Sequence, residues 1–292
     1  MTDARVAAPL TWRVGPWTLE CGERTLVMGV INVTPDSFSD GGRYLDHEAA
    51  VAAGVQMVAD GADLLDVGGE STRPGSDPVP VEEELARVVP VIKRLSAEVS
   101  VPISVDTRKA EVARAALDAG AVVVNDVSAG TSDPRMFEVV RASGAGMVLM
   151  HMRGEPKTMQ RLTHYDDVVG EVRAYLAERV EAAVEAGVEW ERLAVDPGLG
   201  FAKTTPQSLL LMKEVDAFLD LGRPVLVGPS RKSFIGDVLG LPVGERMEGT
   251  AGAVAWMAAR GAHIVRVHDV RPIVRVLRVL DAIRRAGGPG RP

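Results

Sequence analysis

The stretch Thr-Leu-Val-Met-Gly-Val-Ile-Asn-Val-Thr (25–34) is apolar from Leu26 to Ile31 and becomes polar at Asn32. A strand buried on both faces has this pattern, which is typical of parallel sheets. Seven further apolar runs end in the same way, and helix-like sequence follows each of them. They span Ala62–Glu70, Val101–Thr107, Ala121–Ser128, Gly146–Met152, Arg192–Phe201, Pro224–Ser233 and Ala262–Val270. Eight alternations of strand and helix predict an α/β fold, a closed (β/α)8 TIM barrel.

Polar residues gather at the C-terminal ends of these runs. Buried polar groups cost desolvation energy unless a partner or a ligand satisfies them. The active site of a (β/α)8 barrel lies at this rim, so the pattern predicts a site there. The chain has only two asparagines, and both are at predicted strand ends. The strand-end residues include Asn32, Glu70, Asp106, Asn125, His151, Asp196, Lys232, Arg266 and His268.

Composition limits the classes of protein to consider. The chain has 292 residues, 46% of them hydrophobic, which suits one barrel domain with a large core. A net charge of −7 argues against nonspecific nucleic-acid binding. Cys21 is the only cysteine, so an internal disulfide is impossible and a reducing compartment fits. No secretory leader or membrane-length apolar run is present, and we expect a soluble cytoplasmic protein without membrane contact.

Residues 1–24 are distinct from the repeating part of the chain. The segment Thr11–Cys21 alternates around Gly15-Pro16 and predicts a β-hairpin. We expect it to close the N-terminal mouth (bottom) of the barrel, with Trp12 and Trp17 as core-capping residues. No linker follows, so we assign one domain over 1–292, with 1–24 as the hairpin extension and 287–292 as a flexible tail.

Two long connections at the rim are candidate lids. They span Thr34–Leu45 and Ser71–Pro80 and are rich in Gly, Pro and Ser. Long polar loops at a catalytic rim are often functional. The first carries Asp36 and Asp40, and the second carries Thr72 and Arg73. A third long loop, 153–167, has less obvious chemistry.

The acidic strand ends suit a flat heterocycle. Asp106 ends Ile-Ser-Val-Asp, and Asp196 ends Leu-Ala-Val-Asp. A buried carboxylate accepts two hydrogen bonds from adjacent N–H groups, and Asn125 offers a donor and an acceptor. Asp196 is equally compatible with a turn aspartate before Pro-Gly. Asp126 should point away from Asn125 and have a structural role.

The basic strand ends suit phosphate groups. Arg266 and His268 alternate on one strand, so they share a side, and Lys232 ends the preceding run. Asn32 on the first strand adjoins the last strand in a closed barrel, and its amide oxygen suits Mg²⁺. A pure hydrogen-bond role for Asn32, and a rim carboxylate as the partner of Arg231, remain open.

Long motifs then match a known family in order. Met-Gly-Val-Ile-Asn-Val-Thr-Pro-Asp-Ser-Phe-Ser-Asp-Gly-Gly (28–42) and Asp-Val-Gly-Gly-Glu-Ser-Thr-Arg-Pro-Gly (66–75) closely resemble the two signatures of the dihydropteroate synthase family of pterin-binding enzymes. The segments at 104–107, 125–126, 149–152, 196–201, 230–233 and 266–269 match as well. The resemblance implies a transferase of folate biosynthesis. It would condense 6-hydroxymethyl-7,8-dihydropterin diphosphate with 4-aminobenzoate, releasing diphosphate. The resemblance also implies a homodimer that sulfonamides inhibit.

The same resemblance assigns roles residue by residue. Asp106, Asn125, Asp196 and Lys232 would bind the pterin. Thr72, Asn32, Arg266 and His268 would bind diphosphate, with Asn32 holding Mg²⁺. Phe38, Arg73, Pro74 and Ser233 would bind aminobenzoate. The catalytic residues would be Asp106, Asp196, Lys232, Arg73 and Asp40. The chain departs from the usual pattern at Leu199, Ala202 and Pro229.

The implied mechanism is dissociative and SN1-like, without a covalent enzyme intermediate. Cations would stabilise charge on the departing diphosphate, and Asp106 and Asp196 would offset positive charge on the pterin. The role of His151 stays open, although a lone histidine at a strand end is more often a satisfied structural group. A pterin-binding methyltransferase on the same barrel is the nearest alternative. A metal-dependent hydrolase usually has His-x-His where this chain has Asn32-Val33-Thr34. A non-enzymatic pterin-binding paralogue would have lost some of these polar residues.

Overall fold

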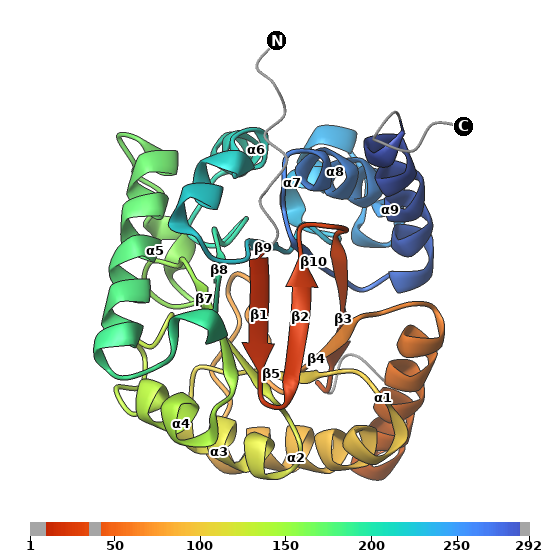
Figure 1. Cartoon of the computed structure of the whole chain (residues 1–292), viewed down its shortest axis with the longest axis vertical. Helices are drawn as coiled ribbons and strands as arrows, with labels where there is room; N and C mark the ends of the chain where they lie inside the picture. Colours follow the sequence, from red (N-terminus) through yellow and green to blue (C-terminus); the bar gives the residue numbers. More distant parts are fainter. Residues whose placement is uncertain (1–9, 35–41, 287–292) are drawn as a thin grey trace.

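A computed structural model describes residues 10–34 and 42–286. Within these residues, eight parallel strands form a barrel surrounded by helices (Figure 1). Every strand lies inside one of the predicted apolar runs, so the predicted fold is confirmed. The barrel strands are β3 (Leu26–Asn32), β4 (Leu64–Gly68), β5 (Ile103–Asp106), β6 (Val123–Asp126), β7 (Gly146–Met150), β8 (Leu193–Asp196), β9 (Leu226–Val227) and β10 (Ile264–Val267).

Helices follow the strands in the order that the sequence predicts. The last two barrel strands are separated by two helices, and short 3-10 turns occur in four connections. The helices are α1 (Gly42–Ala59), α2 (Val81–Glu98), α3 (Ala110–Asp118), α4 (Met136–Ser143), α5 (Val168–Glu185), α6 (Thr205–Lys213), α7 (Ser233–Leu239), α8 (Met247–Ala259) and α9 (Val270–Arg285). The 3-10 turns are η1 (Met159–Arg161), η2 (Trp190–Arg192), η3 (Val215–Leu221) and η4 (Val243–Glu245).

The barrel closes between β8 and β9, which share less backbone pairing than the other neighbouring strands. The hydrogen-bonded order is β8-β7-β6-β5-β4-β3-β10-β9. A single parallel bridge between Val195 and Val225 joins the two ends of this order. The amide of Val195 donates to the carbonyl of Pro224 at 2.9 Å in this bridge. The C-terminal ends of all eight strands therefore face one rim.

Two hydrophobic layers hold the barrel. The larger one lies between the strands and the helices, where α2 buries Val88, Ile92 and Leu95 as its periodicity predicts. Helix α2 continues through Pro90. The smaller layer fills the barrel interior near the strand starts and includes Met28. Burial on both faces explains why the strands are apolar throughout.

The N-terminal hairpin closes the end of the barrel opposite the rim. Strand β1 (Leu10–Val14) pairs antiparallel with β2 (Trp17–Cys21), and the two cross the barrel (Figure 1). Trp12 is fully buried against the strand starts, and its indole Nε1 donates to the carbonyl of Arg192 at 2.9 Å. This half of the capping prediction is confirmed.

Trp17 does not cap the core. It stays 39% exposed because it lies at the turn end of the hairpin, where the amide of Gly15 bonds the carbonyl of Gly144 at the barrel edge. Gly15 has φ +53°, and a Cβ there would lie 2.9 Å from the side chain of Val122. The turn therefore needs glycine.

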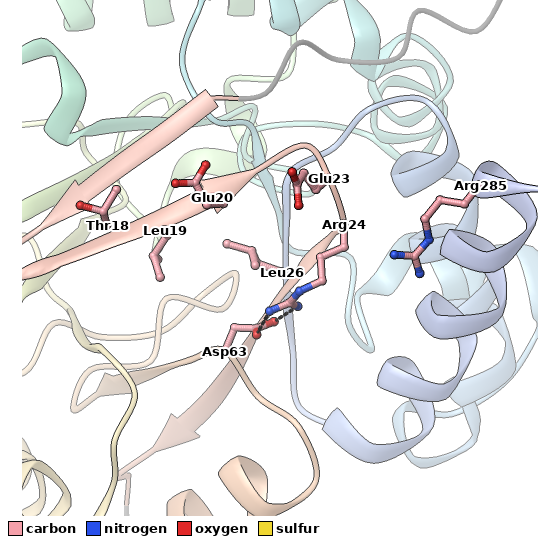
Figure 2. Close-up of a pocket in the computed structure, with 8 residues that line it drawn as sticks. All are labelled: Thr18, Leu19, Glu20, Glu23, Arg24, Leu26, Asp63 and Arg285. Atoms are coloured by element: carbon pink, nitrogen blue, oxygen red, sulfur yellow. Dashed lines mark hydrogen bonds and ion pairs between the residues drawn. The ribbon is translucent and has the colours of Figure 1, made fainter. Parts of the chain in front are cut away.

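A pocket of about 330 Å³ lies beside the hairpin, away from the rim (Figure 2). Two hydrogen bonds of 2.8 and 2.5 Å join Arg24 to Asp63 across it. These two charges neutralise each other, whereas the polar strand ends predicted to form the site lie at the opposite end of the barrel. None of the helices in the described residues combines the length and apolar character needed to cross a membrane.

Candidate active site

A guanidinium from β10 joins the carboxylates of two other strands at the rim. Arg266 Nε donates to Asp66 Oδ2 at 2.6 Å, and its Nη2 donates to Asp106 Oδ2 at 2.7 Å. Asn125 Nδ2 donates to the same oxygen of Asp66 at 2.9 Å. The structure thus brings Asp106, Asn125 and Arg266 together, as the strand-end pattern predicts.

Asp66 is a part of this site that sequence reasoning did not assign. It is fully buried in the middle of β4, and its Oδ1 has no hydrogen-bond partner among the described residues. The signal was present, because a carboxylate interrupts the apolar run Leu-Leu-Asp-Val (64–67). A buried carboxylate needs a partner, and here Arg266 supplies it.

The buried position changes the acidity of these groups. Burial raises the pKa of Asp106 to about 7, although Arg266 opposes the shift. Burial also opposes the charge on Arg266, but Asp66 and Asp106 outweigh it and raise the pKa of the guanidinium. Carboxylates with a raised pKa beside a fixed cation are typical of functional sites.

Asp196 and Lys232 influence each other electrostatically. Burial raises the pKa of Asp196, which Lys232 opposes, and burial lowers the pKa of Lys232 to about 8, which Asp196 opposes. Asp196 Oδ1 accepts a 2.7 Å hydrogen bond from the amide of Gly198. The turn interpretation of Asp196 therefore describes one oxygen only. Lys232 Nζ bonds the carbonyl of Leu199 and lies 4.7 Å from the ring centroid of Phe201.

His268 connects the last strand to the first. Its Nδ1 lies 3.0 Å from Ser230 Oγ, and its Nε2 lies 3.5 Å from Asn32 Nδ2. Burial lowers the pKa of His268 to about 4, with further contributions from Arg266 and other nearby cations. The imidazole is therefore neutral at neutral pH. The contact through Nδ2 leaves the amide oxygen of Asn32 for another partner.

The second candidate lid rests on the third long loop. The amide of Gly75 donates to the carbonyl of Pro156 at 3.0 Å, and Lys157 Nζ lies 2.5 Å from Asp77 Oδ1. Arg73 belongs to the same lid, and its positive charge contributes to the lowered pKa of His268. The loop 153–167 therefore supports the lid, a role that the sequence did not indicate.

A rim pocket of about 440 Å³ includes part of the expected aminobenzoate side. Arg73, Pro74 and Thr34 line it. Thr72 lies in the same loop, and Ser233 is the first residue of α7. The expected residues Phe38 and Asp40, with Asp36, lie outside the described residues.

Three residues near the rim have structural partners in the described part of the chain. Arg231 pairs with the rim carboxylate of Asp269 through two hydrogen bonds of 2.9 and 2.5 Å. Asp126 accepts hydrogen bonds from Ser128 and from the amide of Gly130. His151 is buried, and its Nδ1 lies 2.9 Å from Lys203 Nζ.

Comparison with known proteins identifies the family. The family model described as "Pterin binding enzyme" matches residues 28–268, a range that includes Asp106, Asn125, Asp196, Lys232, Arg266 and His268. The chain belongs to this family.

Relatives of the family cover nearly the whole chain. A dihydropteroate synthase of Synechocystis is 47% identical over 273 residues, 93% of this chain and 94% of its own length. The structure of Xanthomonas albilineans dihydropteroate synthase with 4-aminobenzoic acid is 46% identical, with a TM-score of 0.90 over 97% of this chain and 100% of that one. The Yersinia pestis enzyme in a sulfonamide drug complex is 39% identical, with a TM-score of 0.90 over 95% and 100%. The family and the fold of the chain agree with these relatives throughout.

Proposed function

We propose that the rim condenses 6-hydroxymethyl-7,8-dihydropterin diphosphate with 4-aminobenzoate to give 7,8-dihydropteroate and diphosphate. The observation that carries the proposal is the hydrogen-bonded chain from Asn125 through Asp66 and Arg266 to Asp106. It joins side chains from four strands, and Asp196 and Lys232 interact electrostatically with Arg266 in this chain.

The pterin ring has an edge of adjacent N–H groups and ring nitrogens. Asn125 uses one N–H on Asp66, so its amide oxygen is left to accept from the ring. Asp196 uses Oδ1 on Gly198, so Oδ2 is left for the ring. Lys232 would donate to a ring acceptor. Together these groups orient the bicyclic ring with its methylene group toward His268 and Arg73.

Bond cleavage comes first in the mechanism that we propose. The methylene C–O bond breaks, and its electron pair leaves with the diphosphate. The dihydropterin ring delocalises the positive charge, and ionised Asp106 and Asp196 offset it electrostatically. Arg73 would stabilise the departing anion and would also bind the aminobenzoate carboxylate. The amine of aminobenzoate then forms the C–N bond and releases a proton to solvent. No enzyme nucleophile is required.

Arg266 has a more specific role than a phosphate ligand alone. Its Nε and Nη2 are already bonded to Asp66 and Asp106. These bonds hold Asp106 in place for the ring. The positive charge remains close enough to His268 to lower its pKa, so it also acts on an anion at that position.

We propose Mg²⁺ as the cofactor, held by Asn32. The donor set fits, because the amide oxygen of Asn32 is a hard ligand beside a diphosphate site, and Mg²⁺ takes few protein ligands. In the described residues, no group of three His, Cys, Asp or Glu side chains competes for the ion. Bound Mg²⁺ supplies positive charge that stabilises the leaving diphosphate. A chelator should abolish turnover and Mg²⁺ should restore it, while Asn32→Leu should raise the Mg²⁺ concentration needed for half-maximal activity.

We also propose that the chain forms a homodimer in a reducing cytoplasm. The outer faces of α7 to α9 expose several apolar side chains, among them Val279 and Ile283 one turn apart at 62% and 65% exposure. A second copy would remove this surface from water. Light scattering should give twice 31.0 kDa for the wild type. Val279→Glu should shift the mass toward the monomer. Cell fractionation tests the compartment.

The direct test combines both substrates with Mg²⁺ and follows dihydropteroate by mass spectrometry. Product formation with one diphosphate per dihydropteroate is expected. Sulfonamides should compete with aminobenzoate, as the Yersinia pestis relative in a sulfonamide complex suggests. Absence of product, or transfer of a methyl group from a methylated folate instead, would overturn the proposal.

A further inference from the structure

The loop that follows β8 positions much of the pterin side of the site. Its Gly198 amide donates to Asp196, its Leu199 carbonyl accepts from Lys232, and its Phe201 ring lies 4.7 Å from the Lys232 ammonium. The shape of this loop therefore determines the positions of two charged groups, Asp196 and Lys232, and of the Phe201 ring. What holds the loop in this shape is a buried lysine that has no role in the mechanism above.

Lys203 is 3% exposed and lies near the C-terminal end of this loop, just before α6. Its Nζ lies 2.9 Å from the carbonyl of Gly198, 2.9 Å from the carbonyl of Phe201 and 2.9 Å from His151 Nδ1. Three acceptors match the three protons of an ammonium group. Lys203 therefore ties both ends of the loop to the end of β7.

His151 makes this anchor rigid. Its amide donates to the carbonyl of Asp196 at 3.0 Å, and its ring stands edge-on to Tyr175 with centroids 4.9 Å apart. Burial lowers the pKa of His151 to about 2, and the neighbouring Lys203 adds to the effect. The ring is thus neutral, and Nδ1 accepts from the ammonium.

The loop packs against the end of β7 so closely that no side chain fits between them at Gly198. Gly198 has φ +67°, and a Cβ there would lie 2.0 Å from the carbonyl oxygen of His151. A buried ammonium is costly, so an apolar side chain would fill this position with less desolvation. Simple filling of space therefore does not account for a lysine.

We propose that Lys203 is a positioning residue for the condensation, because its three hydrogen bonds fix the loop that presents Asp196 and orients Lys232. This inference rests on the proposed function. Its measurable consequence falls mainly on the pterin half of the reaction. The loop contacts Asp196 and Lys232 directly, and its link to the aminobenzoate lid is indirect, through the hydrogen bond from Gln160 Nε2 to the Gly200 carbonyl.

The test compares Lys203→Met with Lys213→Met, the same change at an exposed lysine of α6. In Lys203→Met, kcat/KM for the dihydropterin diphosphate should fall by about 10- to 100-fold. KM for aminobenzoate should stay within about twofold, and the dissociation constant for a pterin analogue should rise about tenfold. Lys213→Met should match the wild type. Equal losses for both substrates would indicate general destabilisation and would overturn the proposal.

The pH dependence of kcat/KM tests whether Lys203 also acts through its charge, and not only by stabilising the loop. Asp196 faces Lys232, Arg266, Lys203 and the Gly198 amide, all of which favour its ionised form. Burial lowers the pKa of Lys203 well below its usual value, and Asp196 opposes that shift, so the two groups favour each other's charged forms. Removing the amine of Lys203 should therefore raise the pKa of Asp196. Because Asp106 and Asp196 must both be ionised, the acid limb of kcat/KM contains both groups. In Lys203→Met this limb should become steeper and move to higher pH, and an unmoved limb would contradict the electrostatic part of the role.

His151→Phe tests the same anchor if Lys203→Met does not fold. Phenylalanine keeps an aromatic ring against Tyr175 and removes only the acceptor for Lys203. A pterin-analogue dissociation constant raised by about two- to fivefold, with normal aminobenzoate KM, is expected. A wild-type constant would overturn the inference. Failure of the wild type to form dihydropteroate would instead overturn the proposed function, so the two failures are distinguishable.

Discussion

Arg266 Nη2 lies 2.7 Å from Asp106 Oδ2, which couples a cation of the last barrel strand to a carboxylate of the third. Asp66 holds the other edge of the same guanidinium at 2.6 Å. The expected diphosphate cation therefore also belongs to the pterin side of the site. This relationship makes Asp66 the residue whose loss should affect both halves.

Asp66→Asn should weaken the site and the fold together. It keeps the shape of the side chain but leaves Arg266 with one carboxylate, and breaking a buried charge pair costs about 3–5 kcal/mol. Urea unfolding should show a loss of this order, and kcat/KM should fall at least tenfold. The exposed Asp118→Asn on α3 is the matched control. A variant with wild-type unfolding and turnover would show that Asp66 is not the anchor.

Activity should have a narrow pH optimum. Asp106, with its pKa raised to about 7, must be ionised to offset charge on the pterin, so kcat/KM falls as pH drops below this value. Lys232, with its pKa lowered to about 8, must be protonated to donate, so kcat/KM falls as pH rises above that value. Steady-state rates from pH 5 to 10 give the two limbs.

The alkaline limb has its own control. Lys232→Arg keeps a positive charge over the whole range, so this limb should disappear even though the rate is lower. A wild-type profile without limbs, or an alkaline limb unchanged in Lys232→Arg, would contradict the assignment.

Asp196→Asn should lower kcat well beyond any loss of pterin binding. Asparagine keeps an acceptor for the Gly198 amide but cannot offset positive charge in the transition state. Single-turnover rates and the dissociation constant of a pterin analogue measure the two effects separately. Equal losses in both would show that Asp196 only binds the ring.

The hairpin should matter for stability and not for chemistry. Trp12→Ala empties a fully buried position and should cost about 3–5 kcal/mol of unfolding free energy. Trp17→Ala, on the same hairpin but 39% exposed, should cost under about 1 kcal/mol. Thermal denaturation measures both. At temperatures where Trp12→Ala is folded, its kcat should equal that of the wild type, and a lower value would link the hairpin to the rim.

Local patterns were sufficient to predict the barrel and the ends of its strands. Asp106 and Asn125 could be placed because a strand buried on both faces admits polar groups mainly at its exit end. Asp66 breaks this rule, since it is buried in mid-strand and needs a partner across the barrel. The target of Arg266 was unpredictable for the same reason: alternation gives the side of a strand but not the distance across the barrel.

Loop conformation was the other limit. Ala202 stands where glycine is more usual in the family, and its φ of +50° shows that the position is left-handed. Arg231 also has a positive φ, at +57°. Such conformations follow from closely packed neighbours, such as Gly198 against His151, which lie far apart in the sequence. The contact between Lys203 and His151 depends on the same packing and left no periodic signal.

The single bridge between Val195 and Val225 has a dynamic consequence. A closed barrel should open locally where two neighbouring strands share the fewest hydrogen bonds. Strands β8 and β9 share one bridge, whereas the other neighbouring barrel strands form longer ladders. Asp196 is the last residue of β8, and Lys232 follows β9. Backbone amides of β8 and β9 should therefore exchange with deuterium faster than those of β4. A bound pterin should slow this exchange, because it would contact both Asp196 and Lys232 and so hold the two strands together.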